Sequence, residues 1–312
     1  MTTLAPATVT SAPATSPAGR GRGIKERSFT WMALPALLFF VAFGVIPLLG
    51  VLALSFTTWD GIGTIVPSGF TSWRAVLTDP GLPHALWVTF LVMALSWAAQ
   101  TPMAILLGTF LAGHQKYREV LAVLYFIPLL LSSAALAITY KALLDPNFGL
   151  GAGLGLEFLT QDWLGRPRLA LAGIIVVVSW QFIPFHALIY QGAVRQIPVS
   201  MYEAALLDGA NRVRQFFSIT LPQLKYTIVT SSTLMLVGSL TYIDLVFALT
   251  GGGPGTATRI LPLDMYLTGF RSNQMGEASV LAVILVAVGL TLALGLQRLT
   301  GAEKMESQAE GP

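Results

Sequence analysis

The sequence has no cysteine and few charged residues of either sign. Charged side chains make up 11% of its 312 residues, and histidine occurs only 3 times. The absence of cysteine excludes disulfides, thiolate catalysis and cysteine-ligated metal, and we find no spacing of other residues typical of a metal site. Because an ordinary soluble domain carries about 25% charged residues, this composition excludes that class of protein.

Lysine is also scarce, and none of the lysines has the neighbours that a phosphate loop for ATP requires. No lysine follows a glycine or precedes a serine or threonine, so a Walker A motif is absent. Paired carboxylates and Ser-His-Asp arrangements are missing from the loops as well. We therefore expect no catalytic residues, no metal and no cofactor in this chain, and we do not expect it to be an enzyme. The lysines are Lys25, Lys116, Lys141, Lys225 and Lys304.

Long apolar segments make up most of the chain. Hydrophobic residues account for 54%, and the mean hydropathy is +0.70. About 20 apolar residues suffice for a helix to cross roughly 30 Å of hydrocarbon, and backbone groups in lipid must pair internally. The sequence therefore predicts an all-α integral membrane bundle of six transmembrane helices, in contact with lipid. The expected helices lie near 31–56, 85–112, 120–143, 169–190, 226–249 and 278–297.

The basic residues are distributed as in a membrane protein and do not form a nucleic-acid-binding patch. The net charge is +3, but the basic residues are not clustered among aromatics, so we expect no nucleic-acid partner. Twelve Lys and Arg residues fall in one set of connections and five in the other. The positive-inside rule makes the first set cytoplasmic, so we expect a multi-pass protein of the cell membrane with both termini and residues 203–222 on the cytoplasmic side. The five are Arg74, Arg166, Arg168, Arg259 and Arg271.

Composition also divides the chain along its length. Residues 1–28 are polar and should form a disordered cytoplasmic tail. A cleaved signal peptide is the competing interpretation, but the first apolar stretch, Trp31 to Phe56, is long for one, so we expect a transmembrane helix there. Residues 29–84 should hold the first transmembrane helix and an outer loop, residues 85–300 a core with a cytoplasmic elbow at 198–222, and residues 301–312 a second tail.

The elbow begins with a short predicted helix. Ser200 is placed to cap it, and Glu203, three residues later, completes the pattern of a capping box. The helix should end at Asp208 and Gly209, because glycine readily adopts the left-handed conformation that ends helices.

A second short helix should follow. Asn211 is expected to cap it, with Arg212 outward and Val213 and Phe217 inward. Pro222 should break or kink it.

The complete spacing of this segment resembles the EAA loop of ABC importer permeases. Glu203-Ala204-Ala205 is followed by Gly209 and then by Ile219-x-Leu221-Pro222. In that family the loop docks on a separate ATPase, so the resemblance implies a set of ATPase-coupling residues. A solvated loop is the alternative interpretation. The implied residues are Glu203, Ala204, Ala205, Asp208, Gly209, Arg212, Ile219, Leu221 and Pro222.

The resemblance covers roughly residues 86–299 and implies the type I ABC importer fold. It also implies a second homologous permease, two ATPase subunits that hold ATP and Mg, and an extracytoplasmic solute-binding protein. The run Thr250-Gly-Gly-Gly-Pro-Gly is similar to an outer loop of the maltose and glycerol-phosphate type permeases, which favours a sugar or oligosaccharide. It departs from them by a third glycine and by Ala257.

Polar residues inside the predicted helices are candidates for the substrate path. Gln181 and Phe185 form one stripe, and Met235, Ser239 and Tyr242 share a face if the helix is continuous. Ordinary hydrogen bonding between helices is the alternative for the serines.

Other transport functions stay open. An importer of amino acids, peptides or polyol phosphates would use the same elbow. An ion-coupled secondary transporter would need His186 or Asp244 to carry protons. Proline should kink two of the helices, at Pro102 and at Pro128.

Overall fold

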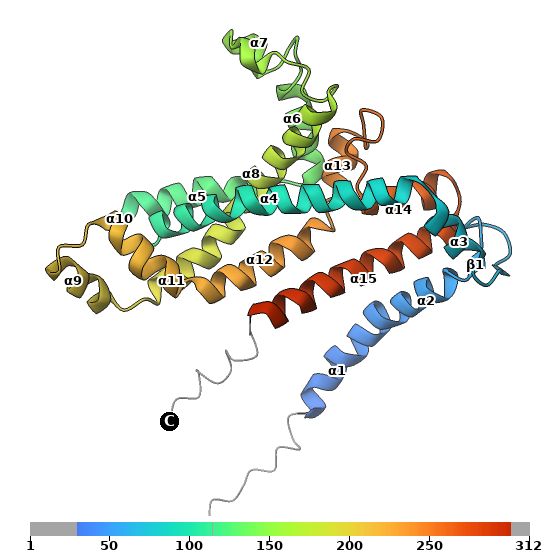
Figure 1. Ribbon diagram of the computed structural model, residues 1–312, viewed down its shortest axis with the longest axis horizontal. Coiled ribbons are helices and arrows are strands. Elements are labelled where there is room, and N and C mark those ends of the chain that lie inside the picture. Colours follow the sequence, from blue (N-terminus) through green and yellow to red (C-terminus); the bar gives the residue numbers. More distant parts are fainter. Residues whose placement is uncertain (1–29, 114, 301–312) are drawn as a thin grey trace, which may run out of the picture. The chain divides into compact units, whose positions relative to one another are not determined.

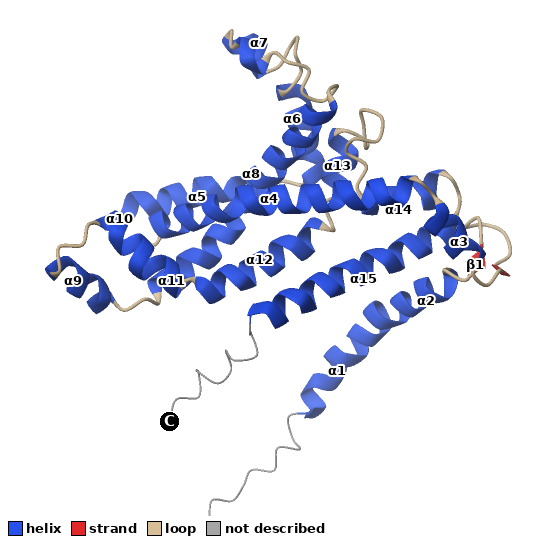
Figure 2. Ribbon diagram, viewed as in Figure 1, coloured by secondary structure: helices blue, strands red, loops and turns tan. Residues whose placement is uncertain are grey.

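The computed structural model describes residues 30–113 and 115–300, and these are almost entirely helical (Figure 2). The described part contains one pair of short antiparallel strands, β1 (Thr57–Thr58) and β2 (Val66–Pro67). The chain divides into two compact units, residues 1–48 and 49–312. The predicted tails, 1–28 and 301–312, lie outside the described residues.

The described residues of the first unit, from Thr30 on, form apolar helix. α1 (Thr30–Phe40) continues through a π-helical turn, η2 (Val41–Val45), into α2 (Ile46–Leu54), of which residues 49–54 belong to the other unit. The rings of Phe39 and Phe43, one turn apart, lie 4.6 Å from each other. The structure thus contains a continuous helical stretch over the first predicted transmembrane segment.

Two long helices, α4 (Gly81–Leu111) and α8 (Pro167–Arg195), pack along each other in the second unit (Figure 1). Their backbones approach closely at Gly108, where an added Cβ would lie 2.6 Å from the carbonyl oxygen of Ala187. α8 starts with Pro167, which suits the first turn because that turn needs no N–H donor. α4 contains Pro102 and stays one uninterrupted helix of 31 residues.

Two of the predicted transmembrane helices are sharply bent. α5 (Lys116–Leu130) and α6 (Ser133–Leu143) meet at 97°, and α12 (Lys225–Ser239) and α13 (Ile243–Leu249) meet at 52°. The first break follows Pro128 by three residues, and the Ser132 hydroxyl accepts a hydrogen bond from Ala135 N to start α6. The predicted bend near Pro128 is confirmed, as a full break between two helices.

Four described helical stretches are long and apolar enough to cross a membrane: Ala33–Leu54, α4, α8 and the last helix, α15 (Met275–Thr300). Counting each bent pair as one crossing raises the total within the described residues to six.

Short helices fill the connections on the side away from the elbow. They are α3 (Thr71–Thr78), α7 (Leu150–Leu154), the 3-10 turn η3 (Glu157–Leu159), α14 (Leu261–Tyr266) and the π-helical turn η5 (Leu267–Arg271). No transmembrane helix is predicted between 250 and 277, yet Leu261 to Asp264 of α14 are buried there. Leu261 N donates to the hydroxyl of Thr89 on α4 at 2.7 Å, which ties this helix to the bundle.

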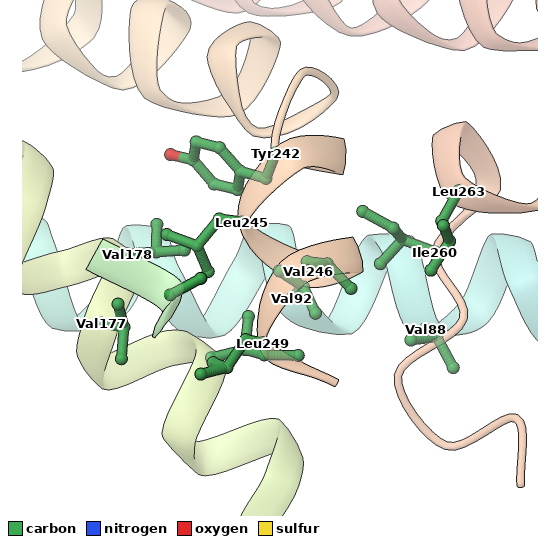
Figure 3. Close-up of a cluster of buried hydrophobic side chains, with 12 residues drawn as sticks. Val88, Val92, Val177, Val178, Tyr242, Leu245, Val246, Leu249, Ile260 and Leu263 are labelled. Atoms are coloured by element: carbon green, nitrogen blue, oxygen red, sulfur yellow. The ribbon is translucent and has the colours of Figure 1, made fainter. Parts of the chain in front are cut away.

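The largest buried cluster joins α4, α8 and α13 (Figure 3). Val92 of α4, Val178 of α8 and Val246 of α13 meet there, and the ring of Tyr242 stacks on Phe182 at 5.4 Å. These helices therefore share a core within the single chain. The buried members are Val88, Val92, Ala137, Ile174, Val177, Val178, Tyr242, Leu245, Val246, Leu249, Ile260 and Leu263.

Candidate functional site

The elbow begins with α9 (Val199–Leu207), which follows the end of α8 after a short turn. Glu203 and Ala204 are exposed and Ala205 is half-buried. Leu206 and Leu207 expose 62% and 90% of their surface. Large exposed apolar side chains on a short helix are typical of a surface that contacts another protein.

α9 ends as the sequence predicts. Gly209 has φ of +72°. Its N–H donates to the carbonyl oxygen of Leu206 at 3.0 Å, and Ala210 N donates to that of Ala205 at 2.8 Å. This pair of bonds is the Schellman motif, which requires a left-handed residue at the position of Gly209. The start of α9 differs from the prediction, because Pro198 precedes the helix and Ser200 lies inside its first turn without capping it.

The second half of the elbow is capped by Asn211. Its side-chain oxygen accepts a hydrogen bond from Arg214 N at 2.8 Å, as expected, and α10 (Arg212–Gln215) follows. Val213 and Phe217 are 65% and 60% exposed in the isolated chain. The prediction that they point inward is therefore wrong. Arg212 is exposed, as expected.

Pro222 does not break the helix. The backbone widens into a π-helical turn, η4 (Phe216–Thr220), and Pro222 lies in the first turn of α11 (Leu221–Gln223), where the missing N–H costs little. Ile219 and Leu221 are half-buried beside it. The hydroxyls of Tyr202 and Thr220 lie 2.9 Å apart, which joins α9 to η4. The elbow is thus held by its own polar contacts and remains attached to α12.

Four of the five candidate path residues are buried within the chain. Gln181, Met235, Ser239 and Tyr242 are 4%, 3%, 5% and 7% exposed, whereas Phe185 is 39% exposed. Met235, Ser239 and Tyr242 do not lie on one helix, because α12 ends at Ser239 and α13 begins at Ile243. The break arises where Ser239, Thr241 and their neighbours form local bonds, such as that from the Thr241 hydroxyl to Gly238 O at 2.7 Å.

Gln181 lies at the break between α5 and α6. Its Nε2 is 3.4 Å from both the carbonyl oxygen of Leu131 and the hydroxyl of Ser133. Backbone carbonyls at a helix break lose their intrahelical partners, and a side-chain amide can replace them. Gln181 therefore contacts the bend directly, a role that the sequence pattern did not indicate.

The two candidate proton carriers have separate surroundings. Nδ1 of His186 lies 2.9 Å from the hydroxyl of Ser231, so the buried imidazole is paired with α12. Asp244 is exposed at the start of α13. Within the part of the chain that the structure describes, these two side chains are not hydrogen-bonded to each other, so they do not form a relay of adjacent groups.

The glycine-rich segment after α13 forms a tight loop. Gly251, Gly252 and Gly255 all have positive φ, which favours glycine at these positions. The Thr258 hydroxyl donates to Gly253 O at 2.8 Å and lies 2.8 Å from the Thr250 hydroxyl. The loop therefore has a defined conformation.

A cavity of about 530 Å³ lies on the side away from the elbow, lined by Trp59, Asp60 and Glu277 among others. Oδ1 of Asp60 accepts hydrogen bonds from Gly63 N at 2.7 Å and Ile62 N at 3.0 Å. The hydrogen bond from Gly63 N and, to a smaller extent, that from Ile62 N hold the pKa of Asp60 below its usual value, because they stabilise the ionised carboxylate. The sequence pattern did not indicate this cavity.

Comparison with known proteins gives consistent results. Residues 100–302 match the family described as "Binding-protein-dependent transport system inner membrane component". The probable ABC transporter permease YurN of Bacillus subtilis (strain 168) is 31% identical, over 84% of this chain and 91% of its own length. The multiple sugar-binding transport system permease MsmF of Streptococcus mutans is 29% identical, over 88% and 95%.

A solved structure shares the fold. A chain from the crystal structure of a bacterial alginate ABC transporter superposes with a TM-score of 0.76 at 21% identity, covering 89% of this chain and 95% of that one. The family match covers the whole elbow and the helices from the end of α4 onward. This chain belongs to the family of binding-protein-dependent transport system inner membrane components.

Proposed function

We propose that this chain is the transmembrane permease subunit of an ATP-driven importer for a sugar or oligosaccharide. The observation that carries the proposal is the elbow: α9 exposes Glu203, Ala204 and the apolar Leu206 and Leu207, and Gly209 and Asn211 define its shape. A short helix with exposed apolar side chains, held by a Schellman turn and a cap, suits docking on an ATPase.

The elbow is built to transmit movement. It links the end of α8 to the start of α12 by way of α9, α10, η4 and α11. The hydroxyls of Tyr202 and Thr220 are hydrogen-bonded to each other across the elbow. A displacement of α9 by ATP-driven closure of the ATPase pair would therefore reach both helices. ATP and Mg would be bound by that partner.

We infer six membrane crossings, with each bent pair forming one of them. Both termini and the elbow would lie in the cytoplasm. Arg118 and Arg195 lie near the elbow ends of α4 and α8, whereas Arg166 and Arg168 lie near the opposite end of α8. Basic residues therefore occur at both ends, and the proposed orientation follows from the larger set of twelve Lys and Arg, which lies on the elbow side.

Phe185 is the candidate most suited to contact the solute. It is exposed on α8 beside His186, with the two rings 5.1 Å apart, and an aromatic face can stack on a sugar ring. Gln181, Met235, Ser239 and Tyr242 would shape the path from behind. A second permease would supply the other wall, and an extracytoplasmic binding protein would deliver the solute.

The sugar class is supported by the name of the Streptococcus mutans relative, a multiple sugar-binding transport system permease, and by the similarity of the loop at Thr250. Importers of amino acids, peptides or polyol phosphates are the alternative, because the elbow is common to them.

The test reverses the charge of Glu203. We expect Glu203→Lys in the assembled transporter to abolish solute-stimulated ATP hydrolysis, because the elbow would no longer fit its ATPase surface, while membrane insertion is kept. The matched control is Glu119→Lys, which makes the same change at an exposed residue of α5 outside the elbow. Normal coupling in Glu203→Lys would contradict the proposed docking role.

A further inference from the structure

A second cavity, of about 320 Å³, lies between the elbow and the adjacent ends of α4 and α8. Three arginines line it: Arg118 from the first turn of α5, Arg195 from the last turn of α8, and Arg212 from α10. The hydroxyl-bearing residues Tyr202 and Thr220 line it too. Among the described residues of its wall there is no aspartate or glutamate.

Arg118 is held in place by several contacts. Its Nη1 donates to the carbonyl oxygen of Phe110, its Nε donates to the hydroxyl of Tyr117 at 3.2 Å, and its guanidinium lies over the Phe110 ring at 4.6 Å. A guanidinium has five N–H donors, so these contacts leave others available. An arginine fixed in this way loses little side-chain entropy when it binds a further acceptor.

Arg195 makes one contact of this kind. Its Nε is 3.4 Å from the carbonyl oxygen of Ala112, at the end of α4. A cation at the C-terminal end of a helix interacts favourably with the last carbonyls, and this accounts for the positions of Arg118 and Arg195. It does not explain Arg212, which belongs to α10 and lies across the cavity.

Three like charges around one cavity repel one another, and nothing in the described wall neutralises them. An anion in the cavity would remove that repulsion. Because arginine binds phosphate through two parallel hydrogen bonds, and three arginines exceed the charge of a single carboxylate, a phosphate group fits this wall best.

We propose that this cavity is a binding site for a phosphate-bearing anion. α4 and α8 are long enough to span a membrane, and the cavity lies at their adjacent ends, the level of lipid headgroups. Basic pockets between membrane helices bind anionic headgroups, so the phosphate belongs either to a phospholipid or to a small soluble molecule. The bound anion links α5, α8 and α10 and thereby stiffens the elbow.

The experiment measures binding to the full-length chain, purified in mild detergent with its associated subunits and depleted of lipid. Short-chain phosphatidylglycerol and inorganic pyrophosphate are titrated separately and followed by native mass spectrometry, with phosphatidylcholine as the lipid of no net charge. We expect one site for phosphatidylglycerol, for pyrophosphate, or for both in competition. Binding of the lipid alone identifies a headgroup site, and binding of pyrophosphate alone identifies a soluble phosphate site.

Arg195→Gln is expected to weaken that binding by roughly tenfold, the loss of about one charge-assisted hydrogen bond. Arg212→Gln, at an exposed position, provides the same test if the first variant does not fold. The matched control is Arg214→Gln, which removes a charge from the same short helix outside the cavity wall and should leave binding unchanged. Absence of binding by both anions, equal binding of phosphatidylcholine, or equal losses in Arg195→Gln and Arg214→Gln would overturn the proposal.

Discussion

At the scale of single residues, local chemistry determines the turns of this chain. Asn211 caps α10 and Gly209 ends α9, both through bonds within four or five residues. Ser200 has the same capping potential but lies in the first turn of α9, because Pro198 already starts the helix with its restricted φ of −58°. The sequence thus contains two helix-start signals, Pro198 and Ser200, and the helix begins at the earlier one.

The turn at Asp60 should depend on pH only in acid. The lowered pKa means that the ionised carboxylate is the form bonded to Ile62 N and Gly63 N. That contribution is present above the ordinary value near 3.8 and is lost as pH falls through the lowered folded value. We expect hydrogen exchange of the Ile62 and Gly63 amides, corrected for the intrinsic rate, to stay slow from roughly pH 8 to pH 5 and to accelerate below about pH 4.

Asp60→Ala should exchange rapidly over the whole range, and Asp60→Asn, which keeps an acceptor oxygen, should lose the acid transition. Protection that already declines between neutral pH and roughly pH 5 would contradict the assignment of this carboxylate.

At the scale of the elements, close contact between α4 and α8 decides what each position tolerates. Gly108 faces Ala187 and Tyr190, and a Cβ there would lie 2.6 Å from the Ala187 oxygen and 2.8 Å from the Tyr190 Cβ. Small residues at such crossings allow membrane helices to approach each other, since packing replaces the hydrophobic effect inside lipid.

We expect Gly108→Ala to lower the free energy of unfolding by about 1–3 kcal/mol, because the backbone of α8 must move away. The measurement is the thermal midpoint of the purified protein in detergent, which should fall by several degrees. Gly192→Ala is the control: it adds the same methyl to α8, where nothing lies within 4 Å. Equal midpoints for the two variants would show that α4 and α8 do not pack at this distance.

At the scale of the whole molecule, the chain has an internal core and leaves other surfaces without a partner in the described residues. Val92, Val178 and Val246 are buried among α4, α8 and α13, whereas the elbow exposes Leu207 and Phe217. The proposed subunits would cover such surfaces.

Purification of the tagged chain in mild detergent from its native host should therefore recover further subunits. We expect mass spectrometry to find an ATPase, a second permease and a solute-binding protein, and we expect the chain alone to hydrolyse no ATP. Transport by the chain alone in proteoliposomes with an ion gradient would contradict the importer and favour a secondary transporter.

The sequence by itself determined the helical membrane class, the positions of the apolar segments, the left-handed turn at Gly209 and the cap at Asn211, because hydropathy and turn chemistry act over a few residues. Only the tertiary structure decided the size of the 97° break after Leu130, the contact of Gln181 with that break, the burial of α14, and the meeting of Arg118, Arg195 and Arg212. Each of these depends on contacts between residues tens of positions apart, and hydropathy is the same for a straight helix and a broken one.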